Sequence, residues 1–183
     1  MEEIIEYKKE TIFSEEEITD DLILSCKEKF KINYLYPWQR IVVENILDSI
    51  KNQNLEIEEN LKDDIFCRGK QIVLLPTGAG KSLCFLAPAL ILKGKTLIIY
   101  PLLALMTDQL RRIQEGNIKV VLLRGGQNQE ERKKIFEDLD NGAKIILANP
   151  EVLQNKSLIE KLKTYNIEHL AIDEAHCVSE WGD

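Results

Sequence analysis

Residues 71–82, QIVLLPTGAGKS, run from an apolar stretch through two glycines to a lysine and a serine. The apolar part, 71–75, has the composition of a buried strand, and a helical pattern starts at residue 82. Glycines between a strand and a helix let backbone N–H groups surround phosphate oxygens, at which the helix directs its positive N-terminal end. The stretch therefore predicts a phosphate-binding loop formed by Thr77, Gly78, Ala79, Gly80, Lys81 and Ser82.

The lysine and the serine have distinct expected roles in this loop. Lys81 would reach the β- and γ-phosphates of a nucleotide, and the Ser82 hydroxyl would ligate Mg²⁺. The strict nucleotide-loop pattern also has a glycine five positions before Gly80, where this chain has Leu75. The alternative is a glycine-rich turn with an incidental lysine, but the strand–loop–helix setting favours the phosphate-binding interpretation.

The rest of the chain repeats the alternation of apolar runs and helical patterns. Runs rich in Ile, Val and Leu occupy 96–100, 119–123, 144–148 and 169–172. Helical patterns occupy 82–93, 102–115, 128–140 and 156–164. Continuous apolar strands that alternate with helices predict a parallel sheet covered on both faces. We expect a three-layer α/β domain with a mostly parallel sheet, and its ligands beyond the carboxyl ends of the strands.

The first third of the chain is more polar. We predict a helix over 14–30, capped by Ser14 with Glu17, a second helix over 38–51, and an insertion at 51–66. Residues 1–30 hold ten acidic and four basic side chains, whereas residues 31–183 hold twenty-one and twenty. The net charge of −7 therefore comes mostly from an acidic N-terminal helical segment at 1–30, and does not argue against a nucleic-acid groove in 31–183.

Two adjacent carboxylates, Asp173 and Glu174, follow the last apolar run. Carboxylates at the end of a buried strand are costly to desolvate unless a ligand uses their charge. A Mg²⁺ ion on ATP phosphates would do so, with Asp173 holding the metal, in part through water, together with Ser82. Glu174 would then orient or deprotonate the attacking water. We expect ATP and Mg²⁺ as cofactors; the alternative is a surface turn with solvated charges.

Four stretches resemble the motifs of superfamily 2 helicases, and in detail those of the RecQ family of DNA helicases. They are LPTGAGKSLCF at 75–85, PLLALMTDQL at 101–110, NPEVL at 149–153 and DEAHCVSEWG at 173–182. The resemblance covers about residues 30–183 and implies a RecA-like P-loop NTPase domain. It also implies the first motor lobe of an ATP-dependent helicase that unwinds DNA in the 3′ to 5′ direction.

The resemblance extends to three further side chains. Gln39 would read adenine, with a glutamine that only starts a helix as the alternative. His176 would couple the nucleotide site to a neighbouring element, and Trp181 would stack on an unpaired base. The family carries an aromatic residue, an arginine and a glycine at the positions of Ile32, Tyr36 and Trp38.

The turns after successive predicted strands are candidate contacts for nucleic acid, because backbone amides at a helix start hold phosphates without side-chain charge. The candidates are Pro101, Leu102, Gln109, Arg124, Gly125, Gly126 and Asn149. The expected partner is single-stranded or partly duplex DNA. RNA is the alternative, because RGGQ at 124–127 is similar to a Gly-Gly segment of DEAD-box RNA helicases.

The family works with a second RecA-like lobe, so we expect this chain to be a fragment that hydrolyses ATP very slowly alone. The alternatives are a lobe of an RNA helicase and a non-catalytic scaffold with the same fold. No apolar run approaches the ~20 residues of a membrane span, so we expect no membrane partner. Four cysteines without a CxxC pair are typical of reduced thiols and favour a cytoplasmic location.

Overall fold

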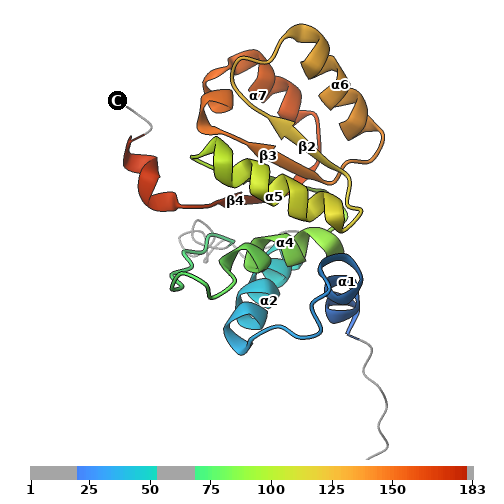
Figure 1. Ribbon diagram of the computed structural model, residues 1–183, viewed down its shortest axis with the longest axis vertical. Helices are drawn as coiled ribbons and strands as arrows, with labels where there is room; N and C mark the ends of the chain where they lie inside the picture. Colours follow the sequence, from blue (N-terminus) through green and yellow to red (C-terminus); the bar gives the residue numbers. More distant parts are fainter. Residues whose placement is uncertain (1–19, 53–68, 181–183) are drawn as a thin grey trace, which may run out of the picture.

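The computed structural model describes residues 20–52 and 69–180 (Figure 1). The helices are α1 (Asp21–Phe30), α2 (Pro37–Asn52), α4 (Lys81–Ile91), α5 (Leu103–Glu115), α6 (Gln129–Asp140) and α7 (Lys156–Lys163). The strands are β1 (Lys95–Ile99), β2 (Val120–Leu123), β3 (Ile145–Ala148) and β4 (Ile167–Ile172). Two 3₁₀ helices, η2 (Pro150–Gln154) and η3 (Ala175–Glu180), follow β3 and β4.

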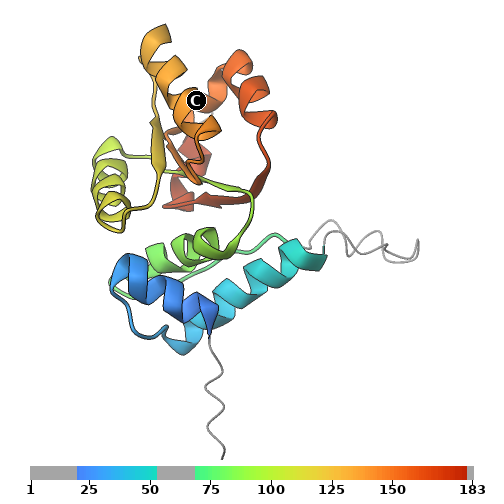
Figure 2. The ribbon, with the colours of Figure 1, turned by 90° about the vertical axis from the view of Figure 1, so that its right-hand side faces the viewer.

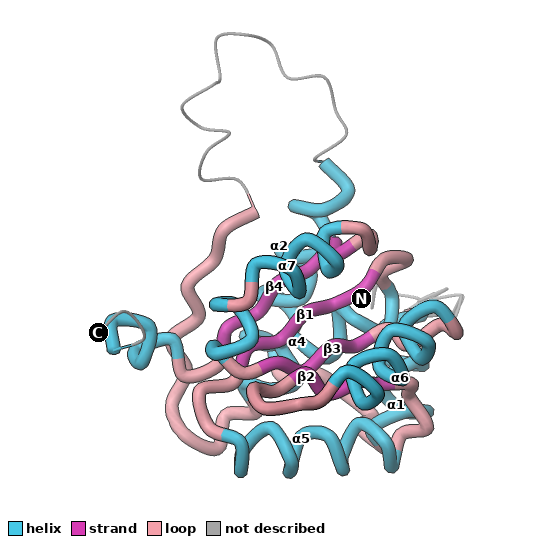
Figure 3. Tube along the Cα trace, turned by 90° about the horizontal axis from the view of Figure 1, so that it is seen from above, coloured by secondary structure: helices cyan, strands magenta, loops and turns pink. Residues whose placement is uncertain are grey.

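The four strands form one sheet in the order β2-β3-β1-β4, and every neighbouring pair is parallel (Figure 3). In the centre, Ile98 of β1 lies beside Leu147 of β3 on one side and Ala171 of β4 on the other. All four strands start and end within one residue or two of the ranges that the apolar runs predict. The predicted parallel sheet is confirmed.

Helices lie on both faces of the sheet (Figure 2), and alternate residues from β1 onward pack against opposite layers. Leu97 and Ile99 pack with residues of α6 and α7, whereas Ile98 and Tyr100 pack with residues of α4 and α5. This alternation follows from the two-residue repeat of a strand and makes both sheet faces apolar. The predicted three-layer α/β architecture is therefore confirmed.

The helices α1 and α2 pack against α4 on the side away from the sheet. The Asp20 carboxylate caps α1 by accepting hydrogen bonds from the N–H groups of Leu22 and Ile23 at 3.1 and 3.2 Å. Arg40 of α2 pairs with that carboxylate. The predicted start of this helix at Ser14 lies outside the described residues, as does most of the predicted insertion at 51–66. The division of the chain at residue 31 stays a prediction.

The predicted strand at 71–75 is not a strand in this structure. The segment has no partner in the sheet, and Ile72 and Leu74 are 91% and 89% exposed. The outer edge of β4 is also unpaired among the described residues, with Leu170 58% exposed and Ile172 42% exposed. Apolar composition alone does not make a strand, because each strand also needs a neighbour for its backbone hydrogen bonds.

Buried His169 of β4 makes the stability of the fold depend on pH. The side chain is 8% exposed, its Nδ1 has no hydrogen-bond partner among the residues that the structure describes, and burial lowers its pKa from 6.5 to about 4. The folded state therefore keeps the imidazole neutral, while the unfolded chain protonates it near pH 6.5. The contribution of His169 to the free energy of unfolding is therefore fully present above pH 6.5 and decreases as the pH falls toward 4.

We expect the His169→Leu variant to lose less stability on acidification than the wild type. Protonation of the unfolded wild type should lower its free energy of unfolding by about 2 kcal/mol between pH 8 and pH 5. Urea unfolding of both proteins at the two pH values isolates this contribution, since every other titrating group is shared. An equal loss in the two proteins would contradict the assignment.

None of the described helices has the length and apolar composition that crossing a membrane requires.

Candidate functional site

The loop before α4 adopts a backbone conformation that requires its glycines. Gly78 and Gly80 have φ values of +82° and +74°, in the left-handed region that favours glycine. A side chain at residue 80 would also collide with the amide of Gln39. Helix α4 begins at Lys81 without a side-chain cap. The predicted loop from Thr77 to Ser82 therefore presents the amides of a helix N-terminus, which is where a phosphate binds.

Two side chains from the start of α2 donate hydrogen bonds to carbonyl oxygens of this loop. The Gln39 amide nitrogen donates to the carbonyl oxygens of Ala79 and Gly80, each at 3.2 Å, and the Trp38 indole N–H donates to Ala79 at 3.4 Å. In a trans peptide the C=O and the next N–H point in opposite directions. Because these carbonyls point toward α2, the N–H groups of Gly80 and Lys81 point away from it.

The lysine of the loop and the first acid after β4 lie within electrostatic reach of each other. The Asp173 N–H donates to Ile99 O at 3.0 Å, which places this residue beside the carboxyl end of β1. The pKa of Asp173 is raised above its ordinary value, first by burial and also by the charge of Glu174. The hydrogen bond from the Glu174 N–H and the charge of Lys81 act in the opposite direction. The Lys81 ammonium itself lies 3.4 Å from Leu75 O. Lys81 therefore lies close enough for its charge to act on Asp173.

The oxygens at this position suit a hard divalent cation. Asp173 is half-buried and makes no direct ion pair with the described residues. The Ser82 hydroxyl lies in the first turn of α4. Mg²⁺ prefers such oxygen donors and usually keeps several waters. The residues present fit the predicted Mg²⁺, which Ser82 and Asp173 would hold.

Glu174 is held in an unusual backbone conformation. Its φ is +50°, in the left-handed region, and its N–H donates to the Asp173 carboxylate at 3.0 Å. The His176 Nδ1 lies 3.3 Å from a Glu174 carboxylate oxygen. Left-handed backbone at a non-glycine residue costs about 1–2 kcal/mol and is concentrated at functional sites. The turn after β4 thus fixes the direction of the Glu174 carboxylate.

Gln109, predicted as a nucleic-acid contact, lies at the phosphate loop in this structure. Its amide nitrogen donates to the Ser82 hydroxyl at 3.3 Å, while its buried carbonyl oxygen has no partner within residues 20–52 and 69–180. Sequence reasoning missed Tyr100, whose buried hydroxyl likewise has no partner in this part of the chain. Burial and then the charge of Asp173 raise the pKa of that phenol. The position of Tyr100 directly after an apolar strand was the available signal.

The other nucleic-acid candidates follow β2, β3 and β1, which are neighbours in the sheet. Their loops therefore lie side by side along the carboxyl edge (Figure 3). The Asn149 side chain is 5% exposed and accepts from the Gly125 N–H at 3.2 Å, so it positions the loop of Arg124 to Gly126. Leu102 is 59% exposed before α5, directly after Pro101. Trp181 lies outside the described residues.

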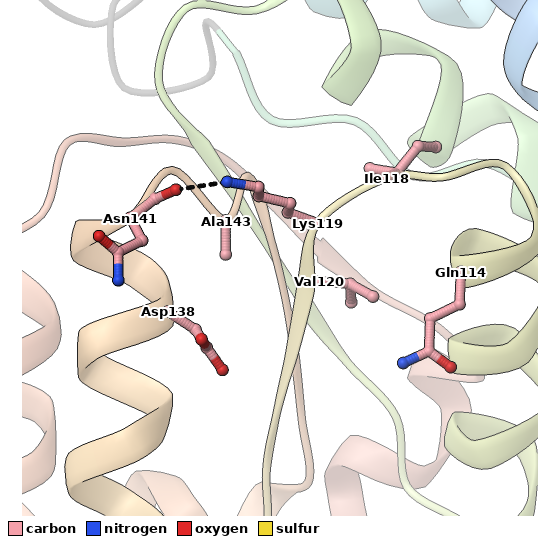
Figure 4. A pocket seen from close by; sticks show the side chains of 7 residues that line it. All are labelled: Gln114, Ile118, Lys119, Val120, Asp138, Asn141 and Ala143. Atoms are coloured by element: carbon pink, nitrogen blue, oxygen red, sulfur yellow. Dashed lines mark hydrogen bonds between the residues drawn. The ribbon is translucent and has the colours of Figure 1, made fainter.

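A hollow of about 270 Å³ lies at the amino ends of β2 and β3, on the opposite edge of the sheet (Figure 4). The residues that line it are Gln114, Ile118, Lys119, Val120, Asp138, Asn141 and Ala143. The Lys119 ammonium there donates to Asn141 O at 2.8 Å. This hollow is separate from the phosphate loop and from the carboxylates after β4.

Comparisons with known proteins identify the family of the chain. The family model described as "DEAD/DEAH box helicase" matches residues 36–183. A probable ATP-dependent DNA helicase RecS of Bacillus subtilis is 39% identical over 126 residues, which are 68% of this chain and 25% of the relative. The ATP-dependent DNA helicase RecQ of the same organism is 38% identical over 110 residues, 60% of this chain and 19% of the relative. An Arabidopsis thaliana ATP-dependent DNA helicase Q-like 5 is 42% identical over 113 residues, 61% of this chain and 12% of the relative. The matched part of the chain spans a quarter or less of these relatives.

Proposed function

The chain belongs to the DEAD/DEAH box helicase family, and on that premise we propose that it is the ATP-binding motor lobe of a RecQ-like DNA helicase. In this proposal ATP hydrolysis drives 3′ to 5′ movement along DNA and its unwinding. The observation that carries the proposal is the glycine-dependent loop at the N-terminus of α4, together with the electrostatic effect of its Lys81 on Asp173. RecQ-type helicases among the relatives support the assignment to DNA.

The chain's own residues supply most of the chemistry. The amides of Gly80 and Lys81, with the Lys81 ammonium, hold the β- and γ-phosphates. Bound Mg²⁺ would neutralise phosphate charge as the bond to the γ-phosphate breaks. Glu174 orients the attacking water and accepts its proton, and His176 keeps the Glu174 carboxylate in place.

One helix connects the proposed nucleic-acid edge to the nucleotide site. Pro101 and Leu102 precede α5, whose Gln109 donates to Ser82 two turns later. A phosphate of the DNA backbone at the start of α5 would therefore act on a helix that already contacts a proposed Mg²⁺ ligand. In this proposal His176 and Trp181 supply a second link between nucleic acid and the ATP site.

The proposed motor needs a second RecA-like lobe, and we propose that the parent protein supplies it. The buried, free thiols of Cys26 and Cys84 fit the proposed cytoplasmic location, since such thiols persist in reducing compartments.

The Asp173→Asn variant tests the proposed nucleotide site. We expect wild-type chain to bind ATP about tenfold more tightly with Mg²⁺ than in EDTA, since a cation bridges the acid to the phosphates. Asp173→Asn should lose that gain while keeping the affinity in EDTA. Fluorescence titration with a labelled ATP analogue measures both, and Asp138→Asn, at the opposite edge of the sheet, is the matched control. An unchanged Mg²⁺ dependence in Asp173→Asn would contradict the proposal.

The nucleic-acid partner is tested separately with labelled oligonucleotides. Fluorescence anisotropy should show tighter binding of single-stranded DNA than of RNA of the same length and sequence. Preference for RNA would favour the RNA-helicase alternative. Nucleic-acid binding without any ATP binding would favour the scaffold.

A further inference from the structure

Tyr100, the first residue after β1, is by volume the largest fully buried side chain among the described residues. Its ring meets the ring of Phe85 in α4 edge-on, with centroids 6.3 Å apart and an interplanar angle of 71°. It belongs to the same apolar layer as Met106 and Ile113 of α5. The hydroxyl has no hydrogen-bond partner within residues 20–52 and 69–180. A buried hydroxyl without a partner destabilises a fold, and native proteins seldom keep one.

The register of the sheet places Tyr100 beside Asp173. The strands β1 and β4 are paired up to Ile99 and Ile172. The Asp173 N–H donates to Ile99 O at 3.0 Å, so the pairing continues to the next residue of each strand. Residues paired in this way lie on the same face of a sheet, and the strands are roughly 4.8 Å apart. Tyr100 and Asp173 are therefore lateral neighbours on the face that α4 and α5 cover.

Each of these two side chains has the group that the other lacks. A buried phenol keeps its proton at neutral pH, so the Tyr100 hydroxyl is a hydrogen-bond donor without an acceptor. One Asp173 oxygen accepts from the Glu174 N–H at 3.0 Å. The other oxygen accepts no hydrogen bond from the part of the chain that the structure describes. Rotation of the Asp173 side chain brings this oxygen toward the Tyr100 hydroxyl.

We propose that Tyr100 is a positioning residue of the nucleotide site, whose hydroxyl donates to the Asp173 carboxylate when Mg²⁺ and ATP bind. The hydrogen bond fixes the carboxylate in the direction that the metal requires. A carboxylate has about four acceptor sites, so it can hold the Glu174 N–H, the hydroxyl and the metal together. The inference rests on the proposed function, because it requires Asp173 to hold the metal. Tyr100 thus lowers the stability of the free chain and raises the affinity of the loaded chain.

Tyr100→Phe removes the hydroxyl and keeps the ring, so it separates these two effects. The free variant should unfold at a temperature about 2–4 °C higher than the wild type, because a buried donor without a partner is gone. Its affinity for ATP should be about fivefold lower with Mg²⁺ and unchanged in EDTA. Thermal unfolding and fluorescence titration with a labelled ATP analogue measure the two quantities.

Tyr165→Phe is the matched control. This phenol packs on the opposite face of the sheet, and its hydroxyl donates to Asp140 at 2.8 Å. Loss of that hydrogen bond should lower the unfolding temperature and leave ATP binding unchanged, with Mg²⁺ and in EDTA.

A double-mutant cycle tests whether Tyr100 acts through Asp173. In the Asp173→Asn background, Tyr100→Phe should cause no further loss of Mg²⁺-dependent ATP affinity, because the carboxylate that the hydroxyl positions is already absent. A further fivefold loss in this background would show that the hydroxyl acts elsewhere, and would overturn the inference.

Three other results would overturn the inference while leaving the proposed function intact. The first is an equal gain of ATP affinity from Mg²⁺ in Tyr100→Phe and in the wild type. The second is a loss of affinity that is the same with Mg²⁺ and in EDTA, which would show a general structural role. The third is a lower unfolding temperature of Tyr100→Phe, which would show that the hydroxyl already has a partner in the free chain. A wild-type chain whose ATP affinity does not depend on Mg²⁺ would overturn the proposed function together with the inference.

Discussion

Replacing Lys81 with alanine should weaken ATP binding by about a hundredfold or more. The ammonium is the side-chain cation that begins α4 at the phosphate loop, and its charge already acts on Asp173. Hydrogen bonds to charged groups contribute about 1.5–3 kcal/mol each, and two phosphate contacts exceed the ~2.7 kcal/mol of a hundredfold change. Isothermal titration of the chain with ATP and Mg²⁺ measures the effect.

The variant should fold normally, because the hydrogen bond that Lys81 makes in this structure is the 3.4 Å contact with Leu75 O. Thermal unfolding checks this. The matched control is Lys93→Ala, an exposed lysine just beyond the other end of α4, which should bind ATP as the wild type does. Undiminished ATP binding by Lys81→Ala would favour the non-catalytic scaffold over the motor.

The second large effect concerns turnover. With saturating single-stranded DNA, the 183-residue chain alone should hydrolyse ATP at least about 10³-fold more slowly than a longer polypeptide that also contains a second RecA-like lobe. The described site supplies the loop, Lys81 and the acid pair, but places no arginine at the Lys81–Asp173 pair. An arginine from a second lobe is worth about 10³–10⁵ in kcat, because it stabilises charge on the transferring phosphoryl group.

Phosphate release under single-turnover conditions compares the two polypeptides without interference from product release. Introducing Glu174→Gln into the longer polypeptide should return its rate to that of the single lobe, although ATP still binds. Rapid turnover by the 183-residue chain would contradict the two-lobe proposal.

Much of the fold was predictable because the strands carry an unusually clear signal. Strands such as β3 are apolar at every position, and such continuous runs occur where a parallel sheet is covered on both faces. The position of Asp173 at the carboxyl edge of the sheet was predictable because this residue directly follows an apolar run. The position of Lys81 was not predictable on the same ground, because the stretch before its loop, 71–75, is not a strand in this structure.

Other parts of the candidate site could not be predicted, because they depend on contacts between residues that lie far apart in the sequence. The hydrogen bonds from Trp38 and Gln39 to the loop join residues about forty positions apart, and that from Gln109 to Ser82 joins residues 27 positions apart. Such polar contacts depend on how α2 and α5 pack, which residue spacing does not fix. The prediction of a strand at 71–75 was wrong for a related reason, because composition does not show whether a neighbouring strand is present to pair with it.

The unpaired edge of β4 has a practical consequence for handling the polypeptide. Among the described residues, β4 has unpaired backbone donors and acceptors beside exposed Leu170 and Ile172, and such an edge is a template for another chain. The apolar segment with exposed Ile72 and Leu74 has a composition suited to pair with it. Concentrated samples should therefore form intermolecular sheets and aggregate, so dilute solutions or a covering polypeptide will be needed to keep the protein monodisperse.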